Sequence, residues 1–338
     1  MAGWGDAGAY EVAPGVHRIP LPLPNDGLHA VNVYAIATSE GLVLIDSGWA
    51  LAEARDLLES ALGGIGFGFE DITRFLITHS HRDHYTLAVE VRRLFGTRIA
   101  VGIGEQANFE AIIEGQVEAQ FADMISWGAV ELAEKLRPVF AKTDHDAVKR
   151  VYELPDEWIP GAQDIVIGDR VLRAIPTPGH TRGHLVFADP EAGLLFSGDH
   201  VLPHITPSIG FEPARAELPL GDYLDSLRLV RAMPDMRMMP AHGPVSDSVH
   251  TRVDELLVHH DVRLAATLEA VRDGAVTAWD AAHKLSWTSR GRRFDELDTF
   301  NRTLAVGETA AHLDVLVVRG ELKSSTVDGV VEYLPLEQ

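Results

Sequence analysis

The stretch Thr78-His79-Ser80-His81-Arg82-Asp83-His84-Tyr85 places three imidazoles and a carboxylate within six consecutive residues. It follows the apolar run 74–77 and precedes residues 87–96, whose spacing of apolar side chains is typical of a helix. We expect residues 74–77 to form a β-strand that delivers the cluster to a loop at its carboxyl end. Side chains in such a loop can converge on one point without straining regular structure.

Histidine and carboxylate ligands together suit zinc, iron or manganese. His79 and His81 are two residues apart, so they can point the same way in extended backbone and hold one ion. Asp83 and His84 are adjacent, so in the following turn they diverge and could serve a second ion. The alternative is a polar, solvated loop that is rich in histidine by chance.

Three further ligand-like residues follow, each at the end of an apolar run. Residues 171–175 lead to His180, residues 194–196 lead to Asp199, and residues 236–239 lead to His242. Each pattern is typical of a strand followed by a turn that contains glycine, which lets the backbone bend sharply or approach an ion closely. Matching partners downstream favour a metal site over a chance cluster.

This ordered set resembles the five-motif signature of the metallo-β-lactamase-fold hydrolases. Asp46, in Leu44-Ile45-Asp46-Ser47-Gly48, matches the first motif, and every motif is present in order across residues 40–243. The resemblance implies an α/β fold, the four-layer αββα sandwich. It also implies that Asp46 steadies the histidine loop without touching metal.

The metal ligands that the resemblance implies form two sets that share one residue. They are His79, His81 and His180 for the first ion, Asp83, His84 and His242 for the second, and Asp199 as the bridge. The expected cofactors are therefore two divalent metal ions, with zinc preferred and iron or manganese as alternatives, because nitrogen and oxygen ligands serve all three.

The catalytic residues expected from this ligand set are Asp83 and Asp199. Two ions about 3.5 to 4 Å apart lower the pKa of a bridging water toward neutrality, which gives a hydroxide able to attack an ester, thioester or lactone carbonyl. Asp83 would orient the attacking water and accept its proton. A thiolate leaving group needs little protonation, so the lack of an obvious general acid favours a thioesterase similar to glyoxalase II.

A chain of 338 residues is long enough for two cores. We predict a metallo-β-lactamase-fold catalytic domain over 1–248, with a helical insertion of two or three helices over 104–150 near the active site. Residues 249–338 should form a second domain, with helices over 249–272, 278–285 and 303–318 and a hairpin of 321–325 with 330–334. This part resembles the winged-helix-like C-terminal domain of the lactamase-β-like subgroup.

The remaining elements follow from local patterns. We predict strands over 16–21, 29–37, 42–46, 98–102, 164–175 and 185–188, helices over 50–63 and 222–233, and a loop over 153–160.

Several side chains are candidate substrate contacts. The insertion carries three apolar candidates within one or two helical turns, although for each of them packing of the insertion onto the main domain is the better explanation. The full set of candidates is Tyr85, Phe121, Met124, Trp127, His200 and His204.

The net charge of −21 repels phosphates, which argues against a nucleic-acid partner. Arg290, Arg292 and Arg293 form a basic knot, but residues 251–338 hold 10 Lys or Arg against 15 Asp or Glu, a balance of 10 − 15 = −5. We therefore prefer a packing or homodimerisation role for this region and a small-molecule acyl substrate for the protein.

The absence of cysteine excludes disulfides and thiolate nucleophiles and fits a reducing cytoplasm. The first residues lack the basic and apolar segments of a signal peptide, and no run approaches the roughly 20 apolar residues of a membrane helix. We expect a cytoplasmic protein without membrane attachment.

Other functions stay open at this stage. The winged-helix-like region suggests a metal-dependent endoribonuclease on single-stranded RNA. A diiron redox protein is disfavoured, because such proteins typically carry a glutamate where His81 stands. A catalytically silent scaffold does not explain the intact ligand set, and a β-lactam substrate is poorly motivated by the long insertion.

Overall fold

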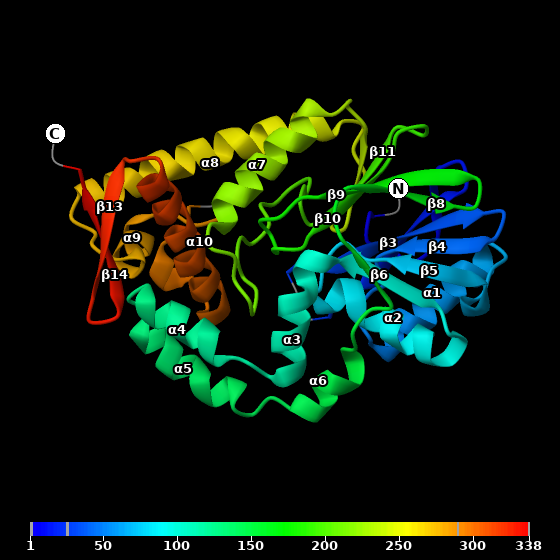
Figure 1. Ribbon diagram of the computed structural model, residues 1–338, viewed down its shortest axis with the longest axis horizontal. Coiled ribbons are helices and arrows are strands. Elements are labelled where there is room, and N and C mark those ends of the chain that lie inside the picture. Colours follow the sequence, from blue (N-terminus) through cyan, green and yellow to red (C-terminus); the bar gives the residue numbers. More distant parts are fainter. Residues whose placement is uncertain (1–2, 25–26, 289–290, 337–338) are drawn as a thin grey trace.

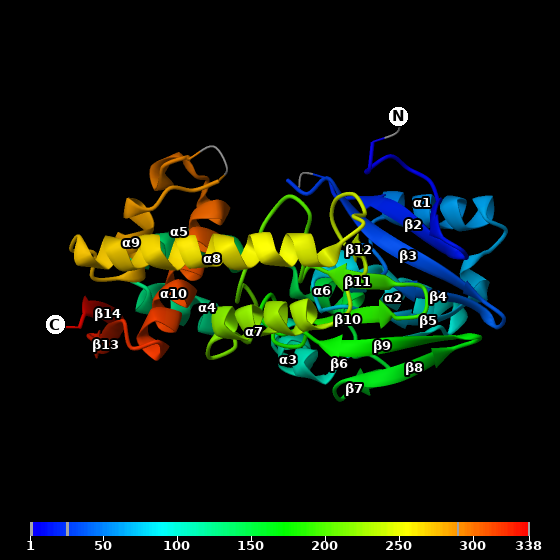
Figure 2. The ribbon, with the colours of Figure 1, turned by 90° about the horizontal axis from the view of Figure 1, so that it is seen from above.

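The computed structural model describes residues 3–24, 27–288 and 291–336. Two β-sheets lie face to face, and helices cover their outer faces (Figures 1 and 2). The layer order is therefore helix, sheet, sheet, helix, which confirms the predicted α/β class and the αββα sandwich.

The first sheet has seven strands in the order in which they occur along the chain. Its first four strands form an antiparallel meander, and the last three run parallel to β4. Only the short β1 and β7 were not predicted, and β7 replaces part of the loop expected over 153–160. The strands are β1 (Tyr10–Ala13), β2 (Val16–Pro22), β3 (Ala30–Thr38), β4 (Gly41–Ile45), β5 (Ile72–Leu76), β6 (Arg98–Gly102) and β7 (Glu157–Ile159).

The second sheet has five strands in the order β12-β11-β10-β9-β8. Its strands are antiparallel except for β11 and β12, which α7 (Pro219–Ala232) connects. They are β8 (Gln163–Ile167), β9 (Arg170–Pro176), β10 (Leu185–Asp189), β11 (Leu194–Gly198) and β12 (Arg237–Pro240).

Side chains from both sheets fill the space between them. Tyr34 of β3 meets Phe196 of β11 edge to face, with ring centroids 5.2 Å apart. The opposite face of the first sheet is covered by α1 (Ala52–Gly64) and α2 (Arg82–Phe95), and that of the second sheet by α7 and α8 (Val249–Arg272). Because helices cover the outer faces, the central strands β3, β10 and β11 are buried on both faces and are apolar on both sides. At the edge of the second sheet, β8 and β9 instead alternate buried and exposed residues.

The insertion contains four helices rather than two or three: α3 (Gln106–Glu114), α4 (Glu118–Ser126), α5 (Val130–Phe140) and α6 (His145–Val151). In Figure 1 it runs from the sheets to the far end of the molecule, where α4 lies beside α10 and α5 packs on α4. Trp127, after α4, accepts a hydrogen bond at its carbonyl from the backbone N–H of Trp279 at 3.0 Å. The middle of the insertion therefore packs on the C-terminal region.

The C-terminal region matches the predicted elements closely. It consists of α8, α9 (Ala278–Lys284), α10 (Thr299–Val318) and a hairpin of β13 (Leu322–Val327) and β14 (Val330–Pro335). Side chains of Ser248, Thr277 and Asp298 cap the three helices, accepting from backbone N–H groups of the first turn. Helix α8 extends from the second sheet to this region (Figure 2). A domain boundary at residue 248 and a winged-helix role stay predictions.

Three short 3-10 helices complete the fold: η1 (Phe69–Asp71), η2 (Ile103–Glu105) and η3 (Phe294–Glu296). Within the ranges described above, no helix combines the length and the apolar character that crossing a membrane requires.

Candidate metal centre

The predicted ligands converge at one edge of the two sheets. β4 and β5 are parallel, so Asp46 and the histidine cluster leave the first sheet at the same edge. β9, β11 and β12 share one direction in the second sheet, so His180, Asp199 and His242 also leave at one edge. Residues far apart in the chain are thereby brought together.

Half of the histidine cluster lies on a helix, which corrects the prediction that all of it lies on a loop. α2 begins at Arg82, directly after His81, so Asp83 and His84 occupy its first turn. The N-terminal end of a helix favours a carboxylate such as Asp83, because the first N–H groups carry partial positive charge. The helix also fixes the direction in which both side chains leave the backbone.

The first ligand group consists of His79, His81, His180 and Asp199. His180 Nε2 lies 3.2 Å from His79 Nε2 and 3.1 Å from His81 Nδ1. Asp199 Oδ2 lies 3.5 Å from His180 Nε2. Three imidazole nitrogens and one carboxylate oxygen thus surround a single point.

The second ligand group consists of Asp83, His84 and His242. Asp83 Oδ2 lies 3.5 Å from both His84 Nε2 and His242 Nε2. The other oxygen of Asp199, Oδ1, lies 3.3 Å from His242 Nε2 and 3.7 Å from His84 Nε2. Asp199 therefore turns one oxygen toward each group, as the bridging role requires.

These separations fit metal ions. A tetrahedral ion with bonds of 2.0 to 2.1 Å holds its ligand atoms about 3.3 Å apart. Moreover, His84 Nε2, His242 Nε2 and Asp199 Oδ1 are buried and have no hydrogen-bond partner in the structure. Buried polar atoms without partners are costly, and a cation at their common centre would satisfy all three.

The opposite ring nitrogens are held by hydrogen bonds that orient the imidazoles. Nδ1 of His84 lies 2.8 Å from Asp46 Oδ2, Nδ1 of His180 lies 2.7 Å from the Ser208 carbonyl, and Nδ1 of His242 lies 2.8 Å from the Ala30 carbonyl. Because these partners only accept, each Nδ1 carries a proton and each Nε2 faces the place where a metal would bind.

Asp46 stands behind the histidine loop and is hydrogen-bonded to it. Its carboxylate also accepts from the backbone N–H of Thr78 at 2.8 Å and from the Thr78 hydroxyl at 3.0 Å. Its φ of +60° lies in the left-handed region, which Asp and Asn tolerate better than other side chains with a Cβ. One carboxylate thus anchors both the start of the loop and His84.

The two groups differ in electrostatics. Burial, followed by the neighbouring imidazoles, lowers the pKa of His79 well below its usual value and that of His81 to about 3. Burial also acts on His84, but the carboxylates of Asp83, Asp46 and Asp199 outweigh it and raise the His84 pKa to about 10. The second group therefore concentrates negative charge, which a bound cation would neutralise.

Among the described residues, none of the predicted substrate contacts belongs to either ligand group. Tyr85 is buried in the core and donates to the Glu153 carbonyl at 2.5 Å. Phe121 and Met124 are buried in the hydrophobic cluster shared with the C-terminal region, and Trp127 packs at its margin. Packing against the C-terminal region thus accounts for the burial of Phe121 and Met124, and contact of the three side chains with substrate stays a prediction.

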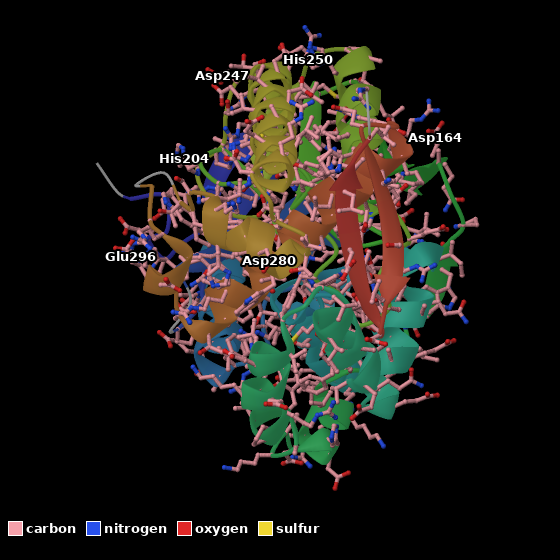
Figure 3. The ribbon with its side chains drawn as sticks, turned by 90° about the vertical axis from the view of Figure 1, so that its left-hand side faces the viewer. Asp164, His204, Asp247, His250, Asp280 and Glu296 are labelled. Carbon is pink, nitrogen blue, oxygen red and sulfur yellow. The ribbon has the colours of Figure 1, made fainter. Side chains whose placement is uncertain are left out.

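The two histidines that follow Asp199 also lie outside the ligand groups. His200 is fully buried, with its ring centroid 5.2 Å from that of Tyr223. His204 is exposed and lies at the surface of the molecule (Figure 3). His184 has a supporting role: its Nε2 accepts from the backbone N–H of Asp199 at 3.2 Å.

Sequence reasoning missed a buried carboxylate near the first group. Glu105, in η2, accepts hydrogen bonds from the hydroxyls of Ser80 and Thr181, which neighbour the metal-ligand candidates in the chain. No ligand-type spacing marks Glu105, and the only local signal is its place directly after Gly102 and Gly104.

Comparisons with known proteins agree with this geometry. Residues 26–242 match the family model of the metallo-beta-lactamase superfamily. The chain is 26% identical over 314 residues to the probable metallo-hydrolase YqjP of Bacillus subtilis, covering 88% of this chain and 90% of that protein. It is 27% identical over 244 residues to the lactamase-like protein nscB of Aspergillus fumigatus, covering 72% of this chain and 57% of nscB.

Among solved structures, the chain is similar to the metallo-beta-lactamase family protein TTHA1429 from Thermus thermophilus. The TM-score is 0.79 at 26% sequence identity, and the match covers 96% of this chain and 100% of that chain. The protein belongs to the metallo-beta-lactamase superfamily. This membership and the histidine and aspartate cluster together support a metal-dependent hydrolase.

Proposed function

We propose that the protein is a dinuclear metal-dependent hydrolase that cleaves a thioester, ester or lactone at the carbonyl carbon, with thioesters preferred. The observation that carries this proposal is the orientation of Asp199, whose two oxygens face the two ligand groups separately. Such a shared carboxylate would hold two cations, with zinc as the expected metal.

When bound, two divalent ions supply a nucleophilic water at neutral pH and stabilise the oxyanion that develops on the carbonyl. The protein's own residues determine the rest. Asp83 keeps 16% of its side chain exposed, whereas His84 beside it is fully buried. Substrate therefore approaches from the side of Asp83, whose ionised carboxylate orients the attacking water and accepts its proton.

The chain itself supports an acyl substrate over other choices. It contains no cysteine, so a thiolate nucleophile of the protein is excluded. A thiolate leaves from a thioester without protonation, so the reaction needs no general acid beyond the groups already named. The net charge of −21 disfavours a polyanionic substrate such as RNA.

Hydrolysis of a panel of acyl thioesters, lactones and labelled single-stranded RNA tests the proposal. We expect thioester cleavage at the highest kcat/KM and no RNA cleavage at micromolar enzyme. Cleavage of RNA alone would instead identify a metal-dependent endoribonuclease. For that alternative, Arg292 and Arg293 are exposed on the C-terminal region, while Arg290 lies outside the described residues. Elemental analysis of protein purified without added metal identifies the ions.

A further inference from the structure

The carboxylate of Glu105 is completely buried and accepts hydrogen bonds from three uncharged side chains. Oε2 accepts from the Ser80 hydroxyl at 2.5 Å and from Asn108 Nδ2 at 3.0 Å, and Oε1 accepts from the Thr181 hydroxyl. Burying a carboxylate is costly, and hydrogen-bond donors offset that cost only when they are held in place. The three donors therefore form a specific binding site for the Glu105 carboxylate.

The positions of two of these donors connect Glu105 to the metal centre. Ser80 lies between His79 and His81, and Thr181 directly follows His180. These two segments come from different sheets and together carry all three imidazoles of the first ligand group. A single carboxylate therefore ties the two segments to each other.

The backbone around Glu105 packs closely against the segment that follows His180. A Cβ atom on Gly104 would lie 2.7 Å from the Cα of Gly183, and a Cβ atom on Gly183 would lie 2.1 Å from the backbone nitrogen of Glu105. Only glycine permits such an approach of two backbones. η2 is consequently pressed against the segment that follows His180.

Further hydrogen bonds hold Glu105 and its donors in place. Asn108 Nδ2 also donates to Glu212 Oε2 at 2.6 Å, and the same oxygen accepts from the backbone N–H of Arg182 at 2.9 Å. At the other end of the insertion, the Tyr152 hydroxyl donates to the Ser80 carbonyl at 3.1 Å. Both ends of the insertion thus brace the first ligand group.

We propose that Glu105 is a positioning residue that holds His79, His81 and His180 at ligand separation before the first metal ion binds. The inference deepens the proposed function and rests on its metal centre, but not on the choice of substrate. Because the second group is oriented by Asp46 and by the Ala30 carbonyl, the effect of Glu105 should be confined to the first ion.

The experiment is a metal titration of the full-length Glu105→Ala and Glu105→Gln variants against a competing chelator. Cadmium-113 NMR distinguishes the two ions, because the first ligand group is richer in nitrogen and the second is richer in oxygen. Loss of a partner that orients ligands lowers metal affinity by about 10- to 100-fold. We expect that loss for the first ion in Glu105→Ala, a smaller loss in Glu105→Gln, which keeps one carbonyl acceptor, and no change for the second ion.

Two further variants keep the test decisive if Glu105→Ala does not fold. Ser80→Ala and Thr181→Val each remove one donor at nearly constant volume, and each should weaken the first ion alone. Glu110→Ala, on the exposed side of α3, is the matched control and should change neither affinity.

Two results would overturn the inference: equal weakening of both ions, or a lower melting temperature with both affinities unchanged. The readout uses no substrate, so it separates the two proposals. Wild-type protein that binds two ions but hydrolyses no acyl substrate would refute the proposed function and leave the role of Glu105 standing.

Discussion

The two ligand groups of the metal centre are prepared for their ions in different ways. In the first group, three imidazoles are held mainly by position, through segments tied together at Ser80 and Thr181. In the second group, carboxylates surround His84 and raise its pKa. One half of the site thus depends on the placement of neutral ligands, and the other half depends on concentrated negative charge.

The two ligand groups of one site are therefore supported by different means. The bridge, Asp199, turns one carboxylate oxygen toward each group. Perturbations at the bridge should affect both ions, whereas perturbations behind one group should affect one.

Removal of both ions should have the largest effect. Treatment with a strong chelator should abolish hydrolysis and lower the melting temperature, because the buried carboxylates of both groups lose their counter-charge. An ion present at 1,000 times its Kd stabilises the folded state by about 4 kcal/mol. Calorimetry before and after chelation measures the shift, and restored zinc should reverse it. Unchanged activity after complete metal loss would contradict the metal centre itself.

Replacement of the bridge by Asp199→Ala should be nearly as severe. The substitution removes one oxygen ligand from each group, and a loss of several kcal/mol of transition-state stabilisation corresponds to a fall in kcat of at least about a thousand-fold. Metal content should fall for both ions together. Asp164→Ala, at an exposed position on β8 (Figure 3), is the matched control and should behave as wild type.

Asp46→Asn should weaken the second half more than the first, because Asn keeps an oxygen that can still accept from the backbone N–H of Thr78. Asn tolerates the same left-handed backbone, but its amide nitrogen donates, so Nδ1 of His84 would have to accept and the proton would move to Nε2, the nitrogen that faces the ion. Loss of such an orienting carboxylate costs about 10- to 100-fold in metal affinity. Metal titration should show this loss for the second ion. Equal loss at both ions would mean that the halves are not supported separately.

Tyr152→Phe should produce the smallest change, and only in the first half. It removes the hydroxyl that donates to the Ser80 carbonyl and leaves the ring in place. One hydrogen bond is worth about 1 kcal/mol, which is about fivefold in affinity. Competition titration should detect this change for the first ion. A larger effect on the second ion would contradict the claim that the insertion supports the first ligand group.

The fold and the ligand residues could be predicted from local sequence because each ligand sits at the end of an apolar run. The runs before His180, Asp199 and His242 are strands β9, β11 and β12, as expected. Helix boundaries were less predictable: α2 begins at Arg82, so it contains two residues that were expected in a loop. A ligand-rich sequence has no apolar spacing that would reveal a helical first turn.

Partners across the chain could not be predicted in the same way. The apolar spacing of α4 indicates that Phe121 and Met124 are buried, but nothing in the spacing says against which surface. The substrate role expected for them rested on proximity to the site, and their packing on the C-terminal region explains their burial instead.

By itself, the sequence determined which side chains could bind metal and in what order they occur, because ligand chemistry and strand periodicity are properties of short segments. Only the tertiary structure decided which oxygen of Asp199 faces which group, and that Glu105 joins the loops of Ser80 and Thr181. Those relations depend on how two sheets stack and how closely two glycine-containing backbones approach. Distances of that kind are set by packing between segments that are remote in the chain.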